Sequence, residues 1–167
     1  MDVDRLIISK LINYVLFNAY SVDSTGLYNG KAGFSLCLFE TGRKLNDKYL
    51  EEQALDLLQE ALLSQNKDIG FENGLSGIGY VLLHLIEHKF IKADFRELFD
   101  DMLMQIIDPK KQQETGVMHS MGIALFLCKL KRAGIYVADS LLMDQIRKMA
   151  EWLEKQMQIA ENKHSCI

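Results

Sequence analysis

Cysteine and histidine are the residues of this chain best suited to chemistry, because both bind metals and exchange protons near neutral pH. The three cysteines are Cys37, Cys128 and Cys166. Their number is odd and they form no metal-binding or redox spacing, which predicts free thiols in a reducing cytoplasm. Cys37 and Cys128 each lie in an apolar run, so we expect both to be buried in the core, as free cysteines commonly are.

Two histidines are the candidates for contact with a ligand. His119 stands where two similar segments earlier in the chain have a glycine, Gly30 and Gly74, at the start of an apolar run that is predicted to be a helix. His84 lies among leucines and isoleucine, where it is either a hydrogen-bonded core residue or a side chain that points into a central cavity. His164 and Cys166 have the spacing of a ligand pair, but they lie at the chain end, where fraying is the simpler interpretation.

The remaining patterns indicate no catalytic site. No serine–histidine–carboxylate set, phosphate-binding loop or paired-carboxylate motif stands out, and the polar run 108–115 is interpreted as a solvated connector. The sequence therefore predicts no catalytic residue, no metal ligand and no resident cofactor.

The composition is that of an ordinary soluble domain. Of the 167 residues, 49% are apolar and 25% are charged, which is enough for one domain with its own core. The net charge is -4 with no basic cluster, which argues against a nucleic-acid partner. No apolar run reaches the roughly 18 residues of a membrane span. Acidic residues near the amino terminus do not fit a secretory signal, so the expected location is the cytoplasm.

A segment of about 44 residues occurs three times along the chain. Each copy begins with a glycine-bearing turn that leads into an apolar run: Gly26 to Phe34, Gly70 to Ile78, and a degraded copy from Gly116 to Ile123. Gly33 and Gly77 are 44 positions apart, and Gly77 and Gly122 are 45 apart. A fixed period of this length is typical of helical repeats that bury their apolar faces on one another. We expect one domain, 1–167, with repeats at about 26–69, 70–114 and 115–160.

Two kinds of helix alternate within these repeats. The runs after the glycine turns are apolar nearly all round, which predicts buried inner helices near Lys31–Thr41, Leu75–His88 and Met118–Ala133. The segments that follow are amphipathic, with apolar residues at helical spacing over 50–62 and 142–157, and they are predicted to be outer helices. With an opening helix near 4–19, the pattern predicts an all-α fold of seven helices, an opening helix and three inner–outer hairpins.

Aspartates and glycines mark the expected helix ends. Asp47, Asp94 and Asp139 precede the amphipathic helices, where an aspartate accepts hydrogen bonds from the free N–H groups of the first turn. Gly42 and Gly134 are predicted to end the preceding helices, because glycine readily adopts the left-handed conformation found there.

The paired helices fit either a HEAT-type solenoid or an α/α toroid. Glycines in the first turn of the inner helices favour the toroid. Glycine costs about 1 kcal/mol relative to alanine in a helix, and a close approach of inner helices at a crowded centre would offset that cost. The sequence therefore predicts a partial α/α toroid. It also predicts that Gly77→Leu destabilises the protein by overpacking.

The glycine repeats resemble those of a known family. The run from Gly74 to Leu85 (GLSGIGYVLLHL) resembles the hallmark repeat of the lanthionine synthetase C-like (LanC-like) family, whose inner helices begin with a G-L-x-G-I-G-W/Y type sequence. The run from Gly26 to Leu36 looks like the same family's first repeat, in the form seen in Bacteroidetes members. The resemblance spans about residues 26–153 and corresponds to the N-terminal half of the family's closed ring of hairpins.

The resemblance implies a chemistry for which this chain lacks the residues. Cyclases of the family hold zinc through two cysteines and a histidine of later repeats, in a Trp-Cys type motif and a Cys-His-Gly motif, and the metal activates a peptide thiolate that closes a thioether ring. This chain has neither motif. The expected protein is thus a truncated or divergent member without cyclase activity of its own. It is expected to bind a peptide or a modifying enzyme in lanthipeptide-type modification, with zinc only where the family's missing half is supplied.

Two other functions remain open. A helical-repeat scaffold would bind a protein partner with no link to peptide modification. A sugar-active α/α barrel would need two acidic residues facing one cavity, and the inner helices offer only Glu40 and Glu87.

The first and last helices carry apolar residues that would lie at the open ends of the repeat array. They are Leu6, Ile7, Leu11, Tyr14, Val15, Met149, Trp152, Leu153 and Met157. Large exposed apolar patches usually mark contact surfaces, and the two-fold dimer is the commonest assembly, so we expect a homodimer. The alternative is that the terminal helices cap the array with their polar faces outward.

Overall fold

A computed structural model confirms the all-helical fold. It describes residues 3–28, 30–113 and 116–164, with the side chains of 3–5, 118 and 161–164 left undescribed. These residues form eight helices and no strand. The helices are α1 (Val3–Ala19), α2 (Lys31–Leu45), α3 (Lys48–Leu62), α4 (Leu75–Glu87), α5 (Phe95–Ile106), α6 (Pro109–Gln113), α7 (Val117–Arg132) and α8 (Asp139–His164). None of the described helices is both long enough and apolar enough to cross a lipid bilayer.

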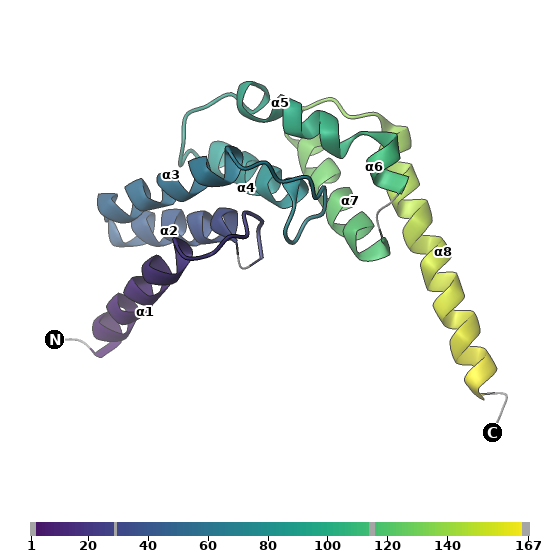
Figure 1. Cartoon of the computed structure of the whole chain (residues 1–167), viewed down its shortest axis with the longest axis horizontal. Coiled ribbons are helices and arrows are strands. Elements are labelled where there is room, and N and C mark those ends of the chain that lie inside the picture. Colours follow the sequence, from purple (N-terminus) through teal and green to yellow (C-terminus); the bar gives the residue numbers. More distant parts are fainter. Residues whose placement is uncertain (1–2, 29, 114–115, 165–167) are drawn as a thin grey trace.

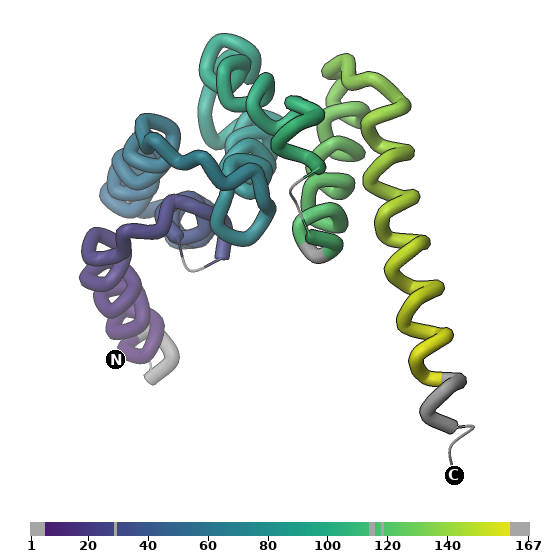
Figure 2. Tube along the Cα trace, turned by 45° about the vertical axis from the view of Figure 1, so that its right-hand side comes forward, coloured from purple at the N-terminus to yellow at the C-terminus, as the bar shows by residue number. Residues whose placement is uncertain are grey.

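The helices form an arch of two layers (Figure 1). Helices α2, α4 and α7 lie on the inner side, and α3, α5 and α8 lie on the outer side. Each inner helix packs against the outer helix that follows it, and α4 also packs against both α2 and α7. Helices α1 and α8 are the two feet of the arch, on either side of its open face (Figure 2). This arrangement is a partial α/α toroid, as the glycines in the first turns of the inner helices predict.

The eighth helix, α6, occupies the run that the sequence suggested was a solvated connector. Gln112 in α6 is buried, and its side-chain amide donates to the Ile106 carbonyl oxygen at 2.8 Å. Its side-chain oxygen accepts a hydrogen bond from the Gln145 amide of α8 at 2.9 Å. The expectation is therefore wrong for Gln112, which is buried and hydrogen-bonded to both α5 and α8. Pro109, Lys110 and Gln113 of the same run are exposed.

Aspartate caps are confirmed at two of the three predicted positions. The Asp47 carboxylate accepts from the backbone N–H groups of Tyr49 and Leu50 at 3.0 and 3.3 Å. The Asp94 carboxylate accepts from the N–H groups of Arg96 and Glu97 at 2.7 and 3.1 Å. Both aspartates therefore close the first turns of outer helices.

Asp139 and Gly42 differ from expectation. Asp139 is the first residue of α8 and forms an ion pair with Lys131 across the α7–α8 turn. Gly42 lies inside α2, which continues to Leu45 and ends at Asn46, with φ of 54°. Asparagine tolerates this left-handed conformation better than most residues, so it serves where a glycine was expected. Gly134 has φ of 76° after α7, as predicted.

The glycines of the inner helices are crowded by a different neighbour from the one expected. A Cβ atom at Gly33 would lie 1.9 Å from the Leu27 carbonyl oxygen, and one at Gly77 would lie 2.0 Å from the Phe71 carbonyl oxygen. Both carbonyls belong to the turn that leads into the same helix. The closest approach at both positions is therefore between a turn and its own helix. At Gly77 the turn of the preceding repeat also contributes, since Leu27 Cβ would lie 2.9 Å from the added atom.

The degraded third turn lacks this local arrangement. There, a Cβ atom at Gly122 would lie 2.1 Å from the Phe71 side chain, so the crowding comes from the preceding repeat. The glycines that precede the two helices also differ. A Cβ atom at Gly74, before α4, would lie 2.4 Å from the Asp68 carbonyl oxygen, whereas one at Gly116, before α7, would have no neighbour within 4 Å.

Helix α1 corresponds to α3 when the 44-residue period is applied. Leu58 and Ala61 of α3 are 1% and 0% exposed because they pack on α2. Their equivalents in α1, Tyr14 and Phe17, are 67% and 80% exposed. Ile12, Val15 and Leu16 of α1 pack against the core, but the side of α1 that carries Tyr14 and Phe17 has no inner helix against it in the described chain.

Candidate functional site

The period places three rows of side chains on the open inner face of the arch. The rows are Leu36, Tyr80 and Leu125; Glu40, His84 and Lys129; and Arg43, Glu87 and Arg132. Each row takes one residue from α2, one from α4 and one from α7. Because the outer helices cover the opposite side of each inner helix, all nine side chains remain partly or fully exposed.

The contact between α2 and α4 is bridged by polar groups. His84 Nε2 lies 3.2 Å from Glu40 Oε1, and the His84 ring stacks on His88 with 4.0 Å between centroids. The Arg43 guanidinium donates to the His88 carbonyl oxygen at 2.9 Å and lies 3.2 Å from the centroid of the Phe90 ring. His84 is therefore a half-buried residue of the inner face, partnered by a carboxylate of the preceding repeat.

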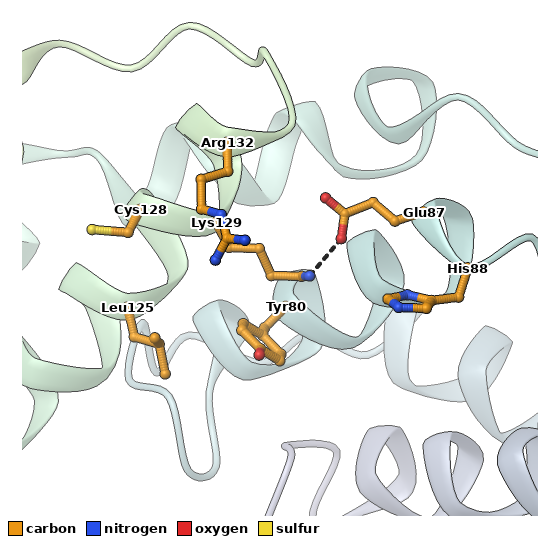
Figure 3. Close-up of a pocket in the computed structure, with 7 residues that line it drawn as sticks. All are labelled: Tyr80, Glu87, His88, Leu125, Cys128, Lys129 and Arg132. Atoms are coloured by element: carbon orange, nitrogen blue, oxygen red, sulfur yellow. Dashed lines mark hydrogen bonds and ion pairs between the residues drawn. The ribbon is translucent and has the colours of Figure 1, made fainter.

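The contact between α4 and α7 opens into a cleft of about 400 Å³ (Figure 3). The cleft is lined by Tyr80, Glu87, His88, Leu125, Cys128, Lys129 and Arg132. Lys129 Nζ lies 2.5 Å from Glu87 Oε2 and 4.9 Å from the centroid of the Tyr80 ring, so one ammonium group links the two walls. This volume falls within the range of small-ligand sites, and the lining combines apolar and charged groups as such sites do.

The charges of this cleft do not balance. Lys129 is neutralised by Glu87, and its side chain is only 15% exposed. Arg132 lines the same cleft and is exposed. Its guanidinium makes no hydrogen bond or ion pair with any of the described residues. The cleft thus carries an excess positive charge in a chain whose net charge is -4.

His119, the other predicted ligand contact, lies at the opposite end of α7 from this cleft. It is exposed in the first turn of α7, and its ring covers Gly70 of the preceding repeat: a Cβ atom at Gly70 would lie 2.3 Å from His119 Cδ2. The Asp68 carboxylate beside it accepts from the Gly70 N–H at 2.7 Å. The structure therefore places His119 on the rim and does not bring it together with His84.

The prediction that Cys37 and Cys128 are buried is wrong, since both are exposed. Their equivalents in the middle repeat, Val81 and Leu83, are 0% and 3% exposed. Helix α4 has an inner helix on each side, whereas α2 and α7 each have one on a single side, so one flank of each stays open. Partial burial raises the pKa of the Cys37 thiol, which disfavours its reactive thiolate at neutral pH.

The described residues do not form a three-ligand zinc site. Among them, no three His, Cys, Asp or Glu side chains lie close enough together to hold a metal ion. The His164 side chain and Cys166 lie outside the described part of the chain. The two acidic residues considered for sugar chemistry line different cavities: Glu87 lines the cleft, and Glu40 lines a pocket with Ile8, Thr41, Lys44 and Leu45.

The residues that line the cleft were not recognised as a group from the sequence. In the sequence, Tyr80 and Lys129 lie in apolar runs and Arg132 lies in a basic one, and nothing local connects the three. The signal that identifies them is the period itself. Counting 44 residues forward from Glu40 reaches His84, and counting 45 more reaches Lys129.

The comparison with protein families agrees with the glycine repeats and the arch. The model of the family described as lanthionine synthetase C-like protein matches residues 3–164, nearly the whole chain. No curated protein and no solved structure matches it. The family match extends over all eight helices, so this chain belongs to the lanthionine synthetase C-like family.

Proposed function

We propose that this chain is a peptide-binding member of the LanC-like family, without cyclase activity of its own, that acts in lanthipeptide-type peptide modification. The observation that carries the proposal is the cleft between α4 and α7 on the inner face, at the contact of two successive repeats. Membership of the family supports a peptide as the ligand. A binding role is further supported because, in the part of the chain that the structure describes, no three metal-binding side chains lie close together.

The inner face offers both kinds of contact that an extended peptide needs. Tyr80 and Leu125 provide apolar surface, and Leu125 is 50% exposed. Lys129, Glu87 and Arg132 provide hydrogen-bonding groups on the walls above. An apolar base with a few convergent polar groups is the usual composition of a ligand pocket.

Peptide binding is tested with a fluorescently labelled peptide library and the purified chain. We expect Tyr80→Ala combined with Leu125→Ala to weaken the bound peptides at least tenfold, because two buried apolar contacts are each worth about 1.5 kcal/mol or more. Leu63→Ala, at an 84% exposed position after α3, is the matched control and should leave binding unchanged. If no library member binds, or if the chain binds stoichiometric zinc and forms a thioether in a dehydrated peptide, the proposal is wrong.

A separate proposal, a homodimer, rests on the apolar side chains on the two feet of the arch. Leu11 and Phe17 of α1 are 60% and 80% exposed, and Leu153 and Met157 of α8 are 54% and 63% exposed. Such patches usually mark contact surfaces, and we propose that a second copy of the chain covers them in a homodimer.

Light scattering at micromolar concentration tests the homodimer. We expect a mass twice the 19.1 kDa of one chain, reduced to the monomer mass by Leu11→Ser with Phe17→Ser or by Leu153→Ser with Met157→Ser. Circular dichroism shows whether each variant keeps its helices. A wild-type chain that runs at 19.1 kDa would instead mean that the feet stay uncovered in the free protein.

A further inference from the structure

Arg132 belongs to the row of Arg43, Glu87 and Arg132. The side chains of Arg43 and Glu87 each bind a group of the next repeat. Arg43, in α2, donates to the His88 carbonyl oxygen, and Glu87, in α4, binds Lys129 of α7. The guanidinium of Arg132, by contrast, makes no hydrogen bond or ion pair with any residue that the structure describes. The cation lies on the wall of the cleft instead (Figure 3).

The chemistry of this guanidinium selects the ligand. Arginine presents several N–H donors in a planar fork, which matches the two oxygens of a carboxylate. Lys129 is a weaker candidate for the primary contact because Glu87 already binds its ammonium group. Arg132 is therefore the available donor, and Lys129 adds positive charge next to it.

The balance of charge favours a carboxylate over a phosphate. With Lys129 and Arg132 against the single carboxylate of Glu87, the lysine, arginine and acidic side chains on its walls leave an excess of one positive charge. One carboxylate neutralises that excess. A phosphate ester carries about -1.5 to -2 charges at pH 7 and would leave uncompensated negative charge beside Glu87.

We infer that the cleft between α4 and α7 is a carboxylate-binding site that anchors a peptide through Arg132, with an apolar group next to the carboxylate resting on Tyr80 and Leu125. This inference rests on the proposed peptide-binding function and names the chemistry of the ligand. Two groups of a peptide carry it: the free C-terminal carboxylate and an aspartate or glutamate side chain.

The experiment uses three labelled pentapeptides and fluorescence anisotropy on the full chain. The first, Gly-Ser-Gly-Ser-Leu, has a free C-terminal carboxylate; the second is its C-terminal amide; the third is Gly-Ser-Glu-Leu-Ser as the amide. We expect the first or third peptide to bind at least tenfold more tightly than the second. The better of the two identifies the source of the carboxylate.

Substitution then locates the contact. Arg132→Gln should weaken the carboxylate-bearing peptide at least tenfold, as expected for loss of a charge-assisted hydrogen bond. Lys131→Gln is the matched control, because it removes one positive charge from the same turn of α7 at a residue that pairs with Asp139. Arg132→Lys should restore only part of the affinity, since lysine lacks the planar fork.

The outcomes separate this inference from the proposed function. If all three peptides bind equally and Arg132→Gln has no effect, the chain binds peptides but the carboxylate site is wrong. The same conclusion follows if a phosphoserine peptide binds more tightly than either carboxylate peptide. If none of the three binds while other library peptides do, the carboxylate inference fails and the proposed function stands. If no peptide of any kind binds, both are overturned.

Discussion

Replacing Gly77 by alanine is expected to cost about 3 kcal/mol in the free energy of unfolding, even though alanine is the better helix former by about 1 kcal/mol. The added methyl group would lie 2.0 Å from the Phe71 carbonyl oxygen and 2.9 Å from Leu27 Cβ. A backbone oxygen cannot rotate away as a side chain can, so the turn 70–74 would have to move. Urea unfolding followed by circular dichroism measures the loss.

Gly116→Ala is the matched control for this substitution. Gly116 also lies at the start of an inner helix, but a Cβ atom there has no neighbour within 4 Å, and its φ of -71° suits any residue. We expect a change of about 1 kcal/mol or less, from the poorer N-cap preference of alanine alone. Equal losses at the two glycines would contradict the view that the turn carbonyl crowds Gly77.

Phe126→Ala is expected to destabilise the chain by about 3–5 kcal/mol, the usual range for a fully buried phenylalanine. Phe126 is 0% exposed and packs edge-on against Phe99, with 6.1 Å between ring centroids. Both rings lie over Gly79, where a Cβ atom would be 2.6 Å from each. Because α4 and α7 meet through this cluster, we also expect limited proteolysis to cut the α7–α8 hairpin faster in the variant.

Met121→Ala provides the comparison on the same helix. Met121 is 52% exposed, so its truncation leaves no cavity and should change the free energy of unfolding by less than about 1 kcal/mol. Thermal or urea melts of the two variants side by side test the assignment of Phe126 to the contact between repeats. A Phe126→Ala variant as stable as Met121→Ala would show that α7 does not pack on α4 in this way.

The local features of the fold could be predicted because each is encoded by residues close together in sequence. The carboxylates of Asp47 and Asp94 cap helices that begin directly after them. The start of α4 at Leu75 follows from the glycine turn just before it. The 44-residue period identified the hairpins because every copy carries its own turn, inner helix and outer helix.

The candidate site was only partly predictable. His84 was singled out from the sequence, and the structure places it on the inner face beside Glu40. Its row partner Lys129 was not singled out, because a lysine in an apolar run looks like an isolated surface charge until the neighbouring repeat supplies Glu87.

The sequence alone determined the order, pairing and period of the helices and the family to which the chain belongs, because hydrophobic periodicity and turn residues act within a single repeat. The tertiary structure decided which flank of each inner helix is covered. Equivalent positions differ in burial, as Val81 and Cys37 do, because α4 packs between two inner helices of the described chain and α2 packs against one. Tertiary contacts also decide which charges of a row are paired, because Glu87 meets Lys129 of α7 whereas Arg132 lines an open cleft.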